Sequence, residues 1–546
     1  MKLPTRIGHC GIQTGSTWAK WAVAAVAAVG CAVAVAVPMR AADEIDVTVD
    51  IGRPGATIHR NIFGQFAEHL GTGIYEGVWV GRESIIPNTR GIRNDVVAAL
   101  KALKVPNVRW PGGCFADEYH WRKGVGRERA VSLNPNWGGV TEPNTFGTHE
   151  FMDFVSQIES EAFLSINVGS GTPQEAAEWL EYMTAAPETS LGKERAGNGH
   201  PAPYKLAYLG IGNESWDCGG NMSPEYYLSQ LKIYSRFVRN FNPAQQEKDK
   251  MLKISVGPGG SGPRWTEWTD RIMKAWQART WSYDYDGLSL HNYTVVKWPP
   301  AHTSVGFGET EYAEILKKTL EMDAMIAEHS AIMDKYDPEK KVALVVDEWG
   351  GWYAPLPGSN PGFLVQQNSL RDAVLAALNL NIFARHADRV RMANIAQMVN
   401  VLQAMILTNK EKMLLTPTYH VFRMYVPFQD ATCLPVAYDA GWYTKGSIAL
   451  PRIDVIAAKD GAGTLWLALT NVDPNRPADI AVRLSGLSGA RAVTASGETL
   501  TAKAVDSVNT FDAPDAVSPK PITGKVEGDR VGLTLEPKSV TVVSVR

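Results

Sequence analysis

Apolar runs of strand length alternate with segments of helical spacing through most of the chain. Uninterrupted apolar runs are typical of parallel strands that are buried on both faces. Eight such runs follow one another along the sequence. Eight strand–helix units close a (β/α)8 barrel, so the pattern predicts the α/β class and a TIM barrel. The predicted strands lie within residues 61–69, 108–110, 162–168, 206–214, 252–256, 286–293, 341–348 and 390–397.

Two of the predicted helices begin with capping signals. Thr172 precedes Pro173 and Glu175, and Ser223 precedes Pro224. A hydroxyl at the N-cap accepts a hydrogen bond from a backbone N–H of the first turn, and Pro fits the first helical position. Further helices are predicted at residues 92–103, 151–158, 265–279, 310–336, 370–386 and 419–425.

The pattern changes after about Pro427. Helical spacing gives way to alternation, as in residues 464–470, and Gly, Asp and Thr become more frequent. Short alternating strands predict a jelly-roll-like β-sandwich over residues 428–546. The alternating run near the N-terminus has no helical partner, so residues 43–58 are predicted to add a strand to this sandwich. Residues 59–427 remain for the barrel.

The N-terminus has the composition of a leader. Three basic residues precede an uncharged run at 21–39 that is rich in Ala and Val, and an Ala-X-Ala site stands at 34–36. This pattern predicts a signal peptide over residues 1–42 and a secreted or periplasmic protein. The alternative is a retained membrane anchor, because the run nearly spans a bilayer.

Composition narrows the possible functions. The 546 residues carry a net charge of −3, which argues against a dedicated binder of nucleic acid or acidic polymers. The 17 Trp residues suit the faces of sugars as well as ordinary packing. Outside the leader the cysteines are Cys114, Cys218 and Cys433. This small odd number excludes a disulfide scaffold and leaves one bridge open.

Two predicted strands end in a carboxylate. Glu214 follows the run that begins at Leu206, and Glu348 ends the run that begins at Lys341. In a TIM barrel the carboxyl ends of the strands meet at one rim, where the chemistry takes place. Two carboxylates on one rim are the groups needed to cleave a glycosidic bond. A single Glu at a strand end is more often a surface residue, but two with aromatic neighbours favour catalysis.

Motifs for other chemistries are missing from the sequence. It contains no His-Glu-X-X-His, no paired Cys-X-X-Cys, no phosphate-binding Gly loop and no Gly-X-Ser-X-Gly elbow. We therefore predict no cofactor and no metal, and we interpret isolated histidines such as His120 and His149 as structural.

Six motifs together resemble glycoside hydrolase family 51, whose best-known members are α-L-arabinofuranosidases. The resemblance covers nearly all of the chain after the leader, and the motifs keep their order and their places at strand ends. They are Phe66–Gly71, Arg109–Phe115, Gly212–Glu214, Ser289–Tyr293, Asp347–Trp349 and Asn394–Gln397.

The resemblance implies roles for three residues and places Cys114 at a fourth position, which contacts the sugar in the family. Glu214 corresponds to the general acid/base, Glu348 to the nucleophile and Glu68 to a residue that grips sugar hydroxyls. Many relatives have Asn at the position of Cys114, and a thiol is a weaker hydrogen-bond partner than an amide. The run 216–222 resembles only one branch of the family, so substrate preference can differ from that of the best-known members.

The neighbouring residues suggest how these carboxylates are held. His291 and Tyr293 alternate on one strand and therefore face the same side. Tyr293 is predicted to donate to Glu348 and keep it ionised, the alternative being a structural His–Tyr pair. Arg109 is predicted to form a fork with Glu68 or Glu348, or else a structural ion pair.

Three further residues are candidates for sugar contacts. Asn213 offers an amide to the 2-hydroxyl, a contact that strengthens in the transition state, and it is otherwise a turn residue. Trp352 is either a sugar platform or part of loop packing. Gln397 stands at the end of the last predicted strand. From there it is predicted to reach a sugar hydroxyl or Glu214.

The sequence thus predicts a retaining, exo-acting hydrolase that removes terminal α-L-arabinofuranosyl groups from arabinan or arabinoxylan. The predicted partner is a carbohydrate and not a nucleic acid, and the family resemblance implies a homo-oligomer. The alternatives are a β-xylosidase or endo-glucanase on the same barrel, and an inactive sugar-binding barrel. The loop at 71–91 is expected to decide between a pocket, for exo action, and an open groove.

Overall fold

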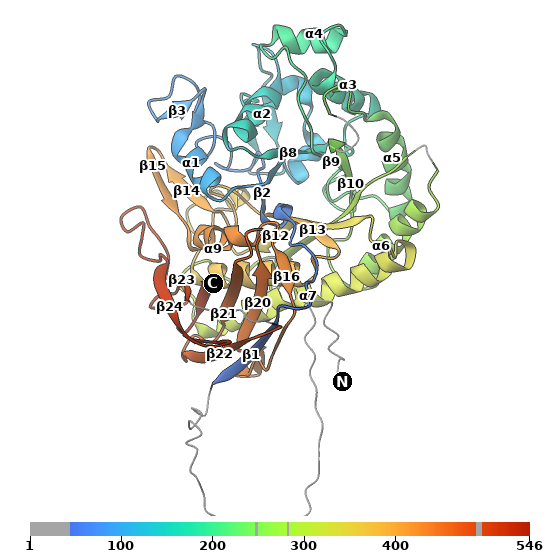
Figure 1. The fold of residues 1–546 in the computed structure, drawn as a ribbon. Coiled ribbons are helices and arrows are strands. Elements are labelled where there is room, and N and C mark those ends of the chain that lie inside the picture. The colour runs from blue at the N-terminus through green and yellow to red at the C-terminus, as the bar shows by residue number, and fades with distance from the viewer. Residues whose placement is uncertain (1–43, 246–248, 281–282, 487–493) are drawn as a thin grey trace, which may run out of the picture.

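The computed structural model describes residues 44–245, 249–280, 283–486 and 494–546 (Figure 1). Eight parallel strands form a closed barrel in the order in which they occur along the chain. The TIM-barrel prediction is confirmed, whereas the predicted leader lies outside the described residues. The barrel strands are β2 (Gly64–Phe66), β5 (Asn107–Trp110), β8 (Glu161–Ile166), β9 (Tyr208–Ile211), β10 (Leu252–Ser255), β11 (Gly287–Thr294), β12 (Ala343–Gly351) and β13 (Val390–Ile395).

Helices surround the barrel and begin where the capping signals predict. The Thr172 hydroxyl accepts a hydrogen bond from Glu175 N, and the Ser223 hydroxyl accepts one from Tyr226 N. In the described ranges no helix is both long and apolar enough to cross a membrane. The helices are α1 (Asn94–Ala102), α2 (Thr148–Gln157), α3 (Pro173–Thr184), α4 (Ser190–Gly197), α5 (Pro224–Phe237), α6 (Pro263–Gln277), α7 (Glu309–Tyr336), α8 (Leu370–Arg385) and α9 (Pro417–Tyr425).

Some local predictions differ from the structure. Residues 61–63 belong to a 3-10 turn rather than to the first strand, and Ile92 lies in the short strand β4 (Ile92–Arg93) rather than in helix α1. The pattern did not indicate α4, whose buried residues are Gly192 and Arg195. A helix that buries a glycine and an arginine has no apolar stripe for a periodicity argument to detect.

A second domain made of strands follows the barrel (Figure 1). Its ten strands are hydrogen-bonded to one another in one continuous order. The strands fold into two sheets around a shared apolar core, so the predicted sandwich is present. Strand β1 (Ile45–Asp50) lies parallel to β22 and antiparallel to β17. The other strands are β16 (Thr432–Leu434), β17 (Val436–Tyr438), β20 (Ile453–Lys459), β21 (Leu465–Asn471), β22 (Ala478–Ser485), β23 (Ala495–Leu500), β24 (Lys520–Glu527), β25 (Arg530–Leu535) and β26 (Ser539–Val545).

A buried polar network joins the barrel to the sandwich. Asp454 on β20 accepts hydrogen bonds from Arg385 Nη1 at 2.7 Å and Asn381 Nδ2 at 2.8 Å, both from helix α8. The side chains of Arg385 and Asp454 are only 9% and 11% exposed. An ion pair removed from water in this way is costly to break from one side, because the remaining charge stays buried.

We expect Asp454→Ala to destabilise the protein by about 3 kcal/mol, because Arg385 would keep its charge without a partner. The measurement is the midpoint of urea unfolding followed by circular dichroism. Asp479→Ala is the matched control, since Asp479 is an exposed residue of the same sandwich. The control is expected to change stability by less than about 0.5 kcal/mol. Equal midpoints for the two variants would show that the network does not hold the domains together.

Candidate active site

Glu348 lies near the carboxyl end of β12, and both of its oxygens are held. Arg109 Nη1 donates to Oε1 at 2.7 Å, and the Tyr293 hydroxyl donates to Oε2 at 2.7 Å. The Glu348 side chain is 6% exposed. Both donors favour the ionised carboxylate.

Glu214 follows the end of β9 and adopts an unusual backbone conformation. Its φ of 37° lies in the left-handed region, which costs a residue other than glycine on the order of 1–3 kcal/mol. Asp217 N and Gly219 N both donate to the Glu214 carbonyl and close a tight turn. His291 Nδ1 lies 2.9 Å from Glu214 Oε1.

The two glutamates converge over the barrel mouth. One ligand atom from each of Glu214, His291 and Glu348 lies within 4.8 Å of the other two. Retaining glycosidases hold their two carboxyl groups about 5 Å apart, whereas inverting enzymes leave roughly 6.5–9.5 Å for a water. The spacing here is that of the retaining class.

The charges of the site are not balanced. The carboxyl groups of Glu68, Glu214, Asp347 and Glu348 share the site with two basic groups, Arg109 and His291. Such an excess of buried acidic groups favours a proton on one of them.

The pKa values follow from this crowding. Burial and the charge of Glu348 raise the pKa of Glu214, against the hydrogen bond from His291. Burial disfavours the charged form of His291, but Glu348 and Asp347 nevertheless raise its pKa to about 10. His291 is therefore a cation at neutral pH that bridges Glu214 and Asp347.

Glu68 stands beside this pair and accepts four hydrogen bonds. Gly113 N at 2.9 Å, Phe115 N at 3.1 Å and Trp137 Nε1 at 2.9 Å donate to Oε1. Gln397 Nε2 donates to Oε2 at 3.0 Å. Gln397 therefore contacts Glu68, whereas one of the two predicted partners was Glu214. Burial and Glu348 raise the pKa of Glu68 to about 7, against the donors from Phe115 and Trp137.

The close approach of the β5 loop to the carboxylates requires glycine. A Cβ atom on Gly113 would lie 2.8 Å from Glu348 Oε1, and one on Gly112 would lie 2.6 Å from Glu68 Cγ. Both distances are shorter than side chains tolerate, so the Pro-Gly-Gly sequence is a packing requirement of the site.

Arg109 organises the space between the catalytic candidates. Besides Glu348, its guanidinium donates from Nη2 to Asn213 Oδ1 at 2.6 Å, and its Nε lies 3.3 Å from Asp347 Oδ2. Arg109 thus contacts Glu348 through one nitrogen and not as the predicted two-nitrogen fork, because its other nitrogens face Asn213 and Asp347. The oxygen of the Asn213 amide is thus engaged by a cation, and the donor end of the same amide, Nδ2, lies 3.9 Å from Cys218 Sγ.

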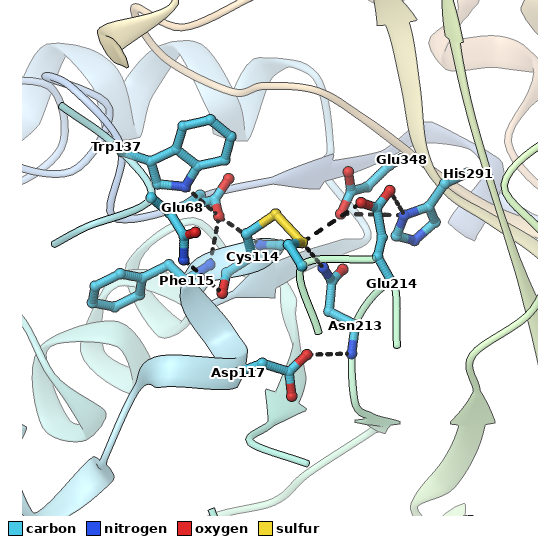
Figure 2. Close-up of a disulfide and its surroundings, with 12 residues drawn as sticks. Glu68, Cys114, Phe115, Asp117, Trp137, Asn213, Glu214, His291 and Glu348 are labelled. Carbon is cyan, nitrogen blue, oxygen red and sulfur yellow. Dashed lines mark hydrogen bonds and ion pairs between the residues drawn. A yellow bond between two sulfur atoms is a disulfide. The ribbon is translucent and has the colours of Figure 1, made fainter. Parts of the chain in front are cut away.

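Cys114 does not present the thiol that the sequence suggested. Its sulfur is bonded to Cys218 in a disulfide, as Figure 2 shows. A disulfide sulfur has no proton to donate, so Cys114 cannot replace the amide donor of relatives that carry Asn there. Spacing in the sequence gave no means of choosing this pair among the three cysteines.

A pocket of about 490 Å³ opens above these groups. Trp352 lies at its side, with its ring 4.8 Å from that of Tyr293 and 5.1 Å from that of Trp298. Residues 71–91, which were expected to shape the opening, are not among those that line it. The lining residues include Glu68, Cys114, Trp137, Glu214, Trp216, Trp265, His291, Trp298, Glu348, Trp352 and Gln397.

Two residues of the site were not identified from the sequence. Asp117 is buried and accepts hydrogen bonds from Val168 N, Gly169 N and Asn213 N, and burial raises its pKa to about 7. Its place two residues after the Arg109–Phe115 motif was the available signal. Trp137 comes from the turn between β6 (Ser132–Asn134) and β7 (Val140–Glu142), a hairpin with no clear signal in the pattern.

Two groups of residues in the described ranges have the spacing of metal ligands. They are Glu214 with His291 and Glu348, and Cys114 with Glu214 and Cys218. In the first group His291 is held as a cation between carboxylates, and in the second the two sulfurs are bonded to each other. Each group therefore lacks at least one of the deprotonated ligands that a metal would need.

Comparisons with known proteins agree with this geometry. A family model for the α-L-arabinofuranosidase 1 domain matches residues 99–293, and one for the α-L-arabinofuranosidase C-terminal domain matches residues 347–539. An intracellular exo-α-L-arabinofuranosidase from Bacteroides ovatus is 42% identical over 519 residues, which cover 94% of this chain and 98% of the relative.

Solved structures extend the agreement to the fold. The GH51 arabinofuranosidase from Xanthomonas axonopodis pv. citri has a TM-score of 0.88 and 52% identity, over 92% of this chain and all of that chain. The α-L-arabinofuranosidase from Thermotoga maritima, solved as an arabinose complex, has a TM-score of 0.76 and 28% identity over the same shares.

The prediction of a secreted or periplasmic protein is contradicted by these comparisons, because the Bacteroides ovatus relative is an intracellular enzyme. The prediction rested on basic residues before an Ala- and Val-rich run. Such a composition is a weak physical criterion, since it describes any apolar N-terminal segment and not the export of the chain behind it.

The barrel, the paired glutamates and the relatives all indicate one activity, the hydrolysis of arabinofuranosides. The match to a 42% identical relative over almost the whole chain decides the family. The chain belongs to the α-L-arabinofuranosidases of glycoside hydrolase family 51.

Proposed function

We propose that this enzyme removes terminal α-L-arabinofuranosyl groups from arabinan- or arabinoxylan-type hemicellulose by a retaining double displacement. In this mechanism Glu348 is the nucleophile and Glu214 the general acid/base. The observation that carries the proposal is that the two carboxylates lie within 4.8 Å of each other in a pocket. That spacing leaves no room for a water between nucleophile and sugar.

In the first step Glu348 attacks carbon one of the sugar while Glu214 protonates the departing oxygen. Glu348 suits the attack because Arg109 and Tyr293 hold both of its oxygens and favour the ionised form. Glu214 suits the proton donation because its raised pKa keeps the proton at a pH where an exposed glutamate has lost it.

In the second step the roles of Glu214 reverse. Loss of the leaving group leaves a glycosyl ester on Glu348, so the charge of Glu348 disappears and with it a cause of the raised pKa of Glu214. Glu214 then ionises more readily and can take a proton from the incoming water. One change of charge therefore links the acid role of Glu214 to its base role.

Sugar recognition is assigned to residues around this pair. Glu68 and Gln397 are joined by a hydrogen bond and both line the pocket, where they can meet ring hydroxyls. Asn213 is buried and its Nδ2 lies 3.9 Å from Cys218 Sγ, so its contact with the 2-hydroxyl requires Nδ2 to exchange the sulfur for the sugar. Trp352 offers a flat apolar face at the pocket side.

Exo action on polymer side groups is the interpretation that the pocket favours. The pocket has a bounded volume of about 490 Å³, and tryptophans line it. The Bacteroides ovatus relative is described as exo-acting. Both observations support release of single terminal residues, whereas assembly into a homo-oligomer stays a prediction from family resemblance.

Glu214→Ala should lose far more activity on methyl α-L-arabinofuranoside than on the 4-nitrophenyl glycoside in the glycosylation step. A nitrophenolate leaves without a proton, whereas methoxide needs one, and general acid catalysis contributes about 10²–10⁴-fold. Presteady-state release of nitrophenol measures the first step for the activated substrate. Equal losses on both substrates would contradict the assignment of Glu214.

Retention should be visible in the products. When methanol competes with water, we expect methyl α-L-arabinofuranoside, because the second displacement restores the starting configuration. A 2-fluoro or aziridine-type arabinofuranosyl probe should leave an ester on Glu348, which peptide mass spectrometry locates. Release of the inverted anomer in an NMR time course, or an adduct elsewhere, would falsify the mechanism.

The basic limb of the pH profile of kcat/KM should reflect the loss of the proton from Glu214. Because burial raises its pKa, kcat/KM for methyl α-L-arabinofuranoside should hold past the ordinary titration range of glutamate and fall as pH rises through the shifted pKa. In Glu214→Gln this limb should vanish, since the amide does not titrate. An unchanged limb in that variant would assign it to another group.

A further inference from the structure

The disulfide between Cys114 and Cys218 lies inside the active site (Figure 2). It joins the loop after β5 to the loop after β9, across 104 residues of sequence. Cys218 Sγ is 3.7 Å from Glu214 Oε2, and Cys114 lines the pocket. The bond is therefore in contact with a group assigned to the reaction, not only with the surrounding fold.

On the β5 side the disulfide is tied to the sugar-binding carboxylate. The residues on either side of Cys114 both donate to Glu68, Gly113 N at 2.9 Å and Phe115 N at 3.1 Å. Cys114 cannot shift without displacing these donors, because it is the single residue between them. The disulfide thus fixes the acid/base loop relative to Glu68.

On the β9 side the disulfide closes the turn that starts at Glu214. Asp217 N donates to the Glu214 carbonyl at 2.7 Å and Gly219 N does so at 3.2 Å, which places Cys218 within the turn. The turn is compact, since a Cβ on Gly219 would lie 1.8 Å from the Asn213 carbonyl oxygen. Glu214 has a left-handed φ, and such a conformation persists only where its surroundings hold it.

A second tie holds the start of the same turn without sulfur. Asp117 Oδ2 accepts a hydrogen bond from Asn213 N at 2.9 Å, while its Oδ1 accepts from Val168 N and Gly169 N. Loss of the disulfide would therefore leave the backbone of Asn213 anchored. What would be released is the end of the turn at Cys218, next to the Glu214 carboxyl group.

The chemistry of sulfur gives a second reason why loss of the disulfide would affect Glu214. The disulfide sulfurs carry no proton, and Cys218 Sγ covers one side of the Glu214 carboxyl group at 3.7 Å. Reduction would give two thiols, each with an S–H that can donate to a carboxylate. The sulfurs and a Glu214 oxygen lie within 4.8 Å of one another, so these donors would be in reach. Donors and water both favour the ionised form, which is the wrong form for an acid.

We propose that the Cys114–Cys218 disulfide is a positioning element for Glu214, and that full activity requires the bond. The proposal rests on Glu214 being the acid/base. A dithiol reduces the bond. The two sulfurs of the dithiol become a disulfide, the S–S bond of the protein breaks, and each cysteine sulfur gains one proton. The enzyme is accordingly sensitive to reduction in its proton-transfer step rather than in its fold.

The test compares full-length oxidised enzyme, the same enzyme treated with dithiothreitol, and the double variant Cys114→Ser/Cys218→Ser. Mass spectrometry of peptides verifies that the bond is present in the oxidised enzyme and absent from the other two samples. For reduced enzyme and double variant, kcat/KM should fall about tenfold or more on methyl α-L-arabinofuranoside and less than about threefold on the 4-nitrophenyl glycoside. The basic limb of the pH profile should move to lower pH in both.

Controls separate this role from a structural one. Cys433→Ser should show the same change in substrate selectivity with dithiothreitol as the wild type, and in the double variant dithiothreitol should leave the selectivity between the two substrates unchanged. Unchanged selectivity and pH profile after verified reduction would overturn the proposal, as would equal losses on both substrates together with a lower melting temperature. If oxidised Glu214→Ala itself shows no difference between the substrates, the acid/base assignment fails instead.

Discussion

The site depends on burying more negative charge than its cations neutralise. Taking an ion out of water costs several kcal/mol even after relaxation, so like-charged carboxylates at the barrel mouth need compensation. Arg109 supplies part of it by contacting both Glu348 and Asp347, and His291 supplies a further part as a cation between Glu214 and Asp347. What remains uncompensated favours a proton on one carboxyl group, and that proton is the one the proposed acid step uses.

The barrel brings the strand ends together, but the loop after β5 sets the distances among them. Gly113 N and Phe115 N bind Glu68, Cys114 is bonded to the acid/base loop, and Asp117 accepts from Asn213 N. These contacts come from one short segment of chain. A carboxylate for the sugar and a carboxylate for the proton are thus held against the same backbone, which limits their independent movement.

Much of this arrangement follows from local patterns in the sequence. The eight apolar runs predicted the barrel, and the alternation of His291 and Tyr293 predicted that both face one side, where the structure has them contacting Glu214 and Glu348. Contacts between distant loops could not be predicted in this way. The partner of Cys114, the donors to Glu68 and the role of Asp117 depend on how loops after different strands meet, and no periodicity records that.

The partners of the two glutamates also explain why their proposed roles are not interchangeable. Glu348 accepts from Arg109, a permanent cation, and from Tyr293, so protonating it would break two strong interactions. Glu214 contacts His291 and an apolar disulfide sulfur. These neighbours stabilise a negative charge less than the two donors to Glu348 do. A swap of roles would require an acid beside a guanidinium and a nucleophile beside sulfur. The asymmetry of the surroundings therefore supports the proposed roles, in which Glu348 is the nucleophile and Glu214 the group that carries the proton.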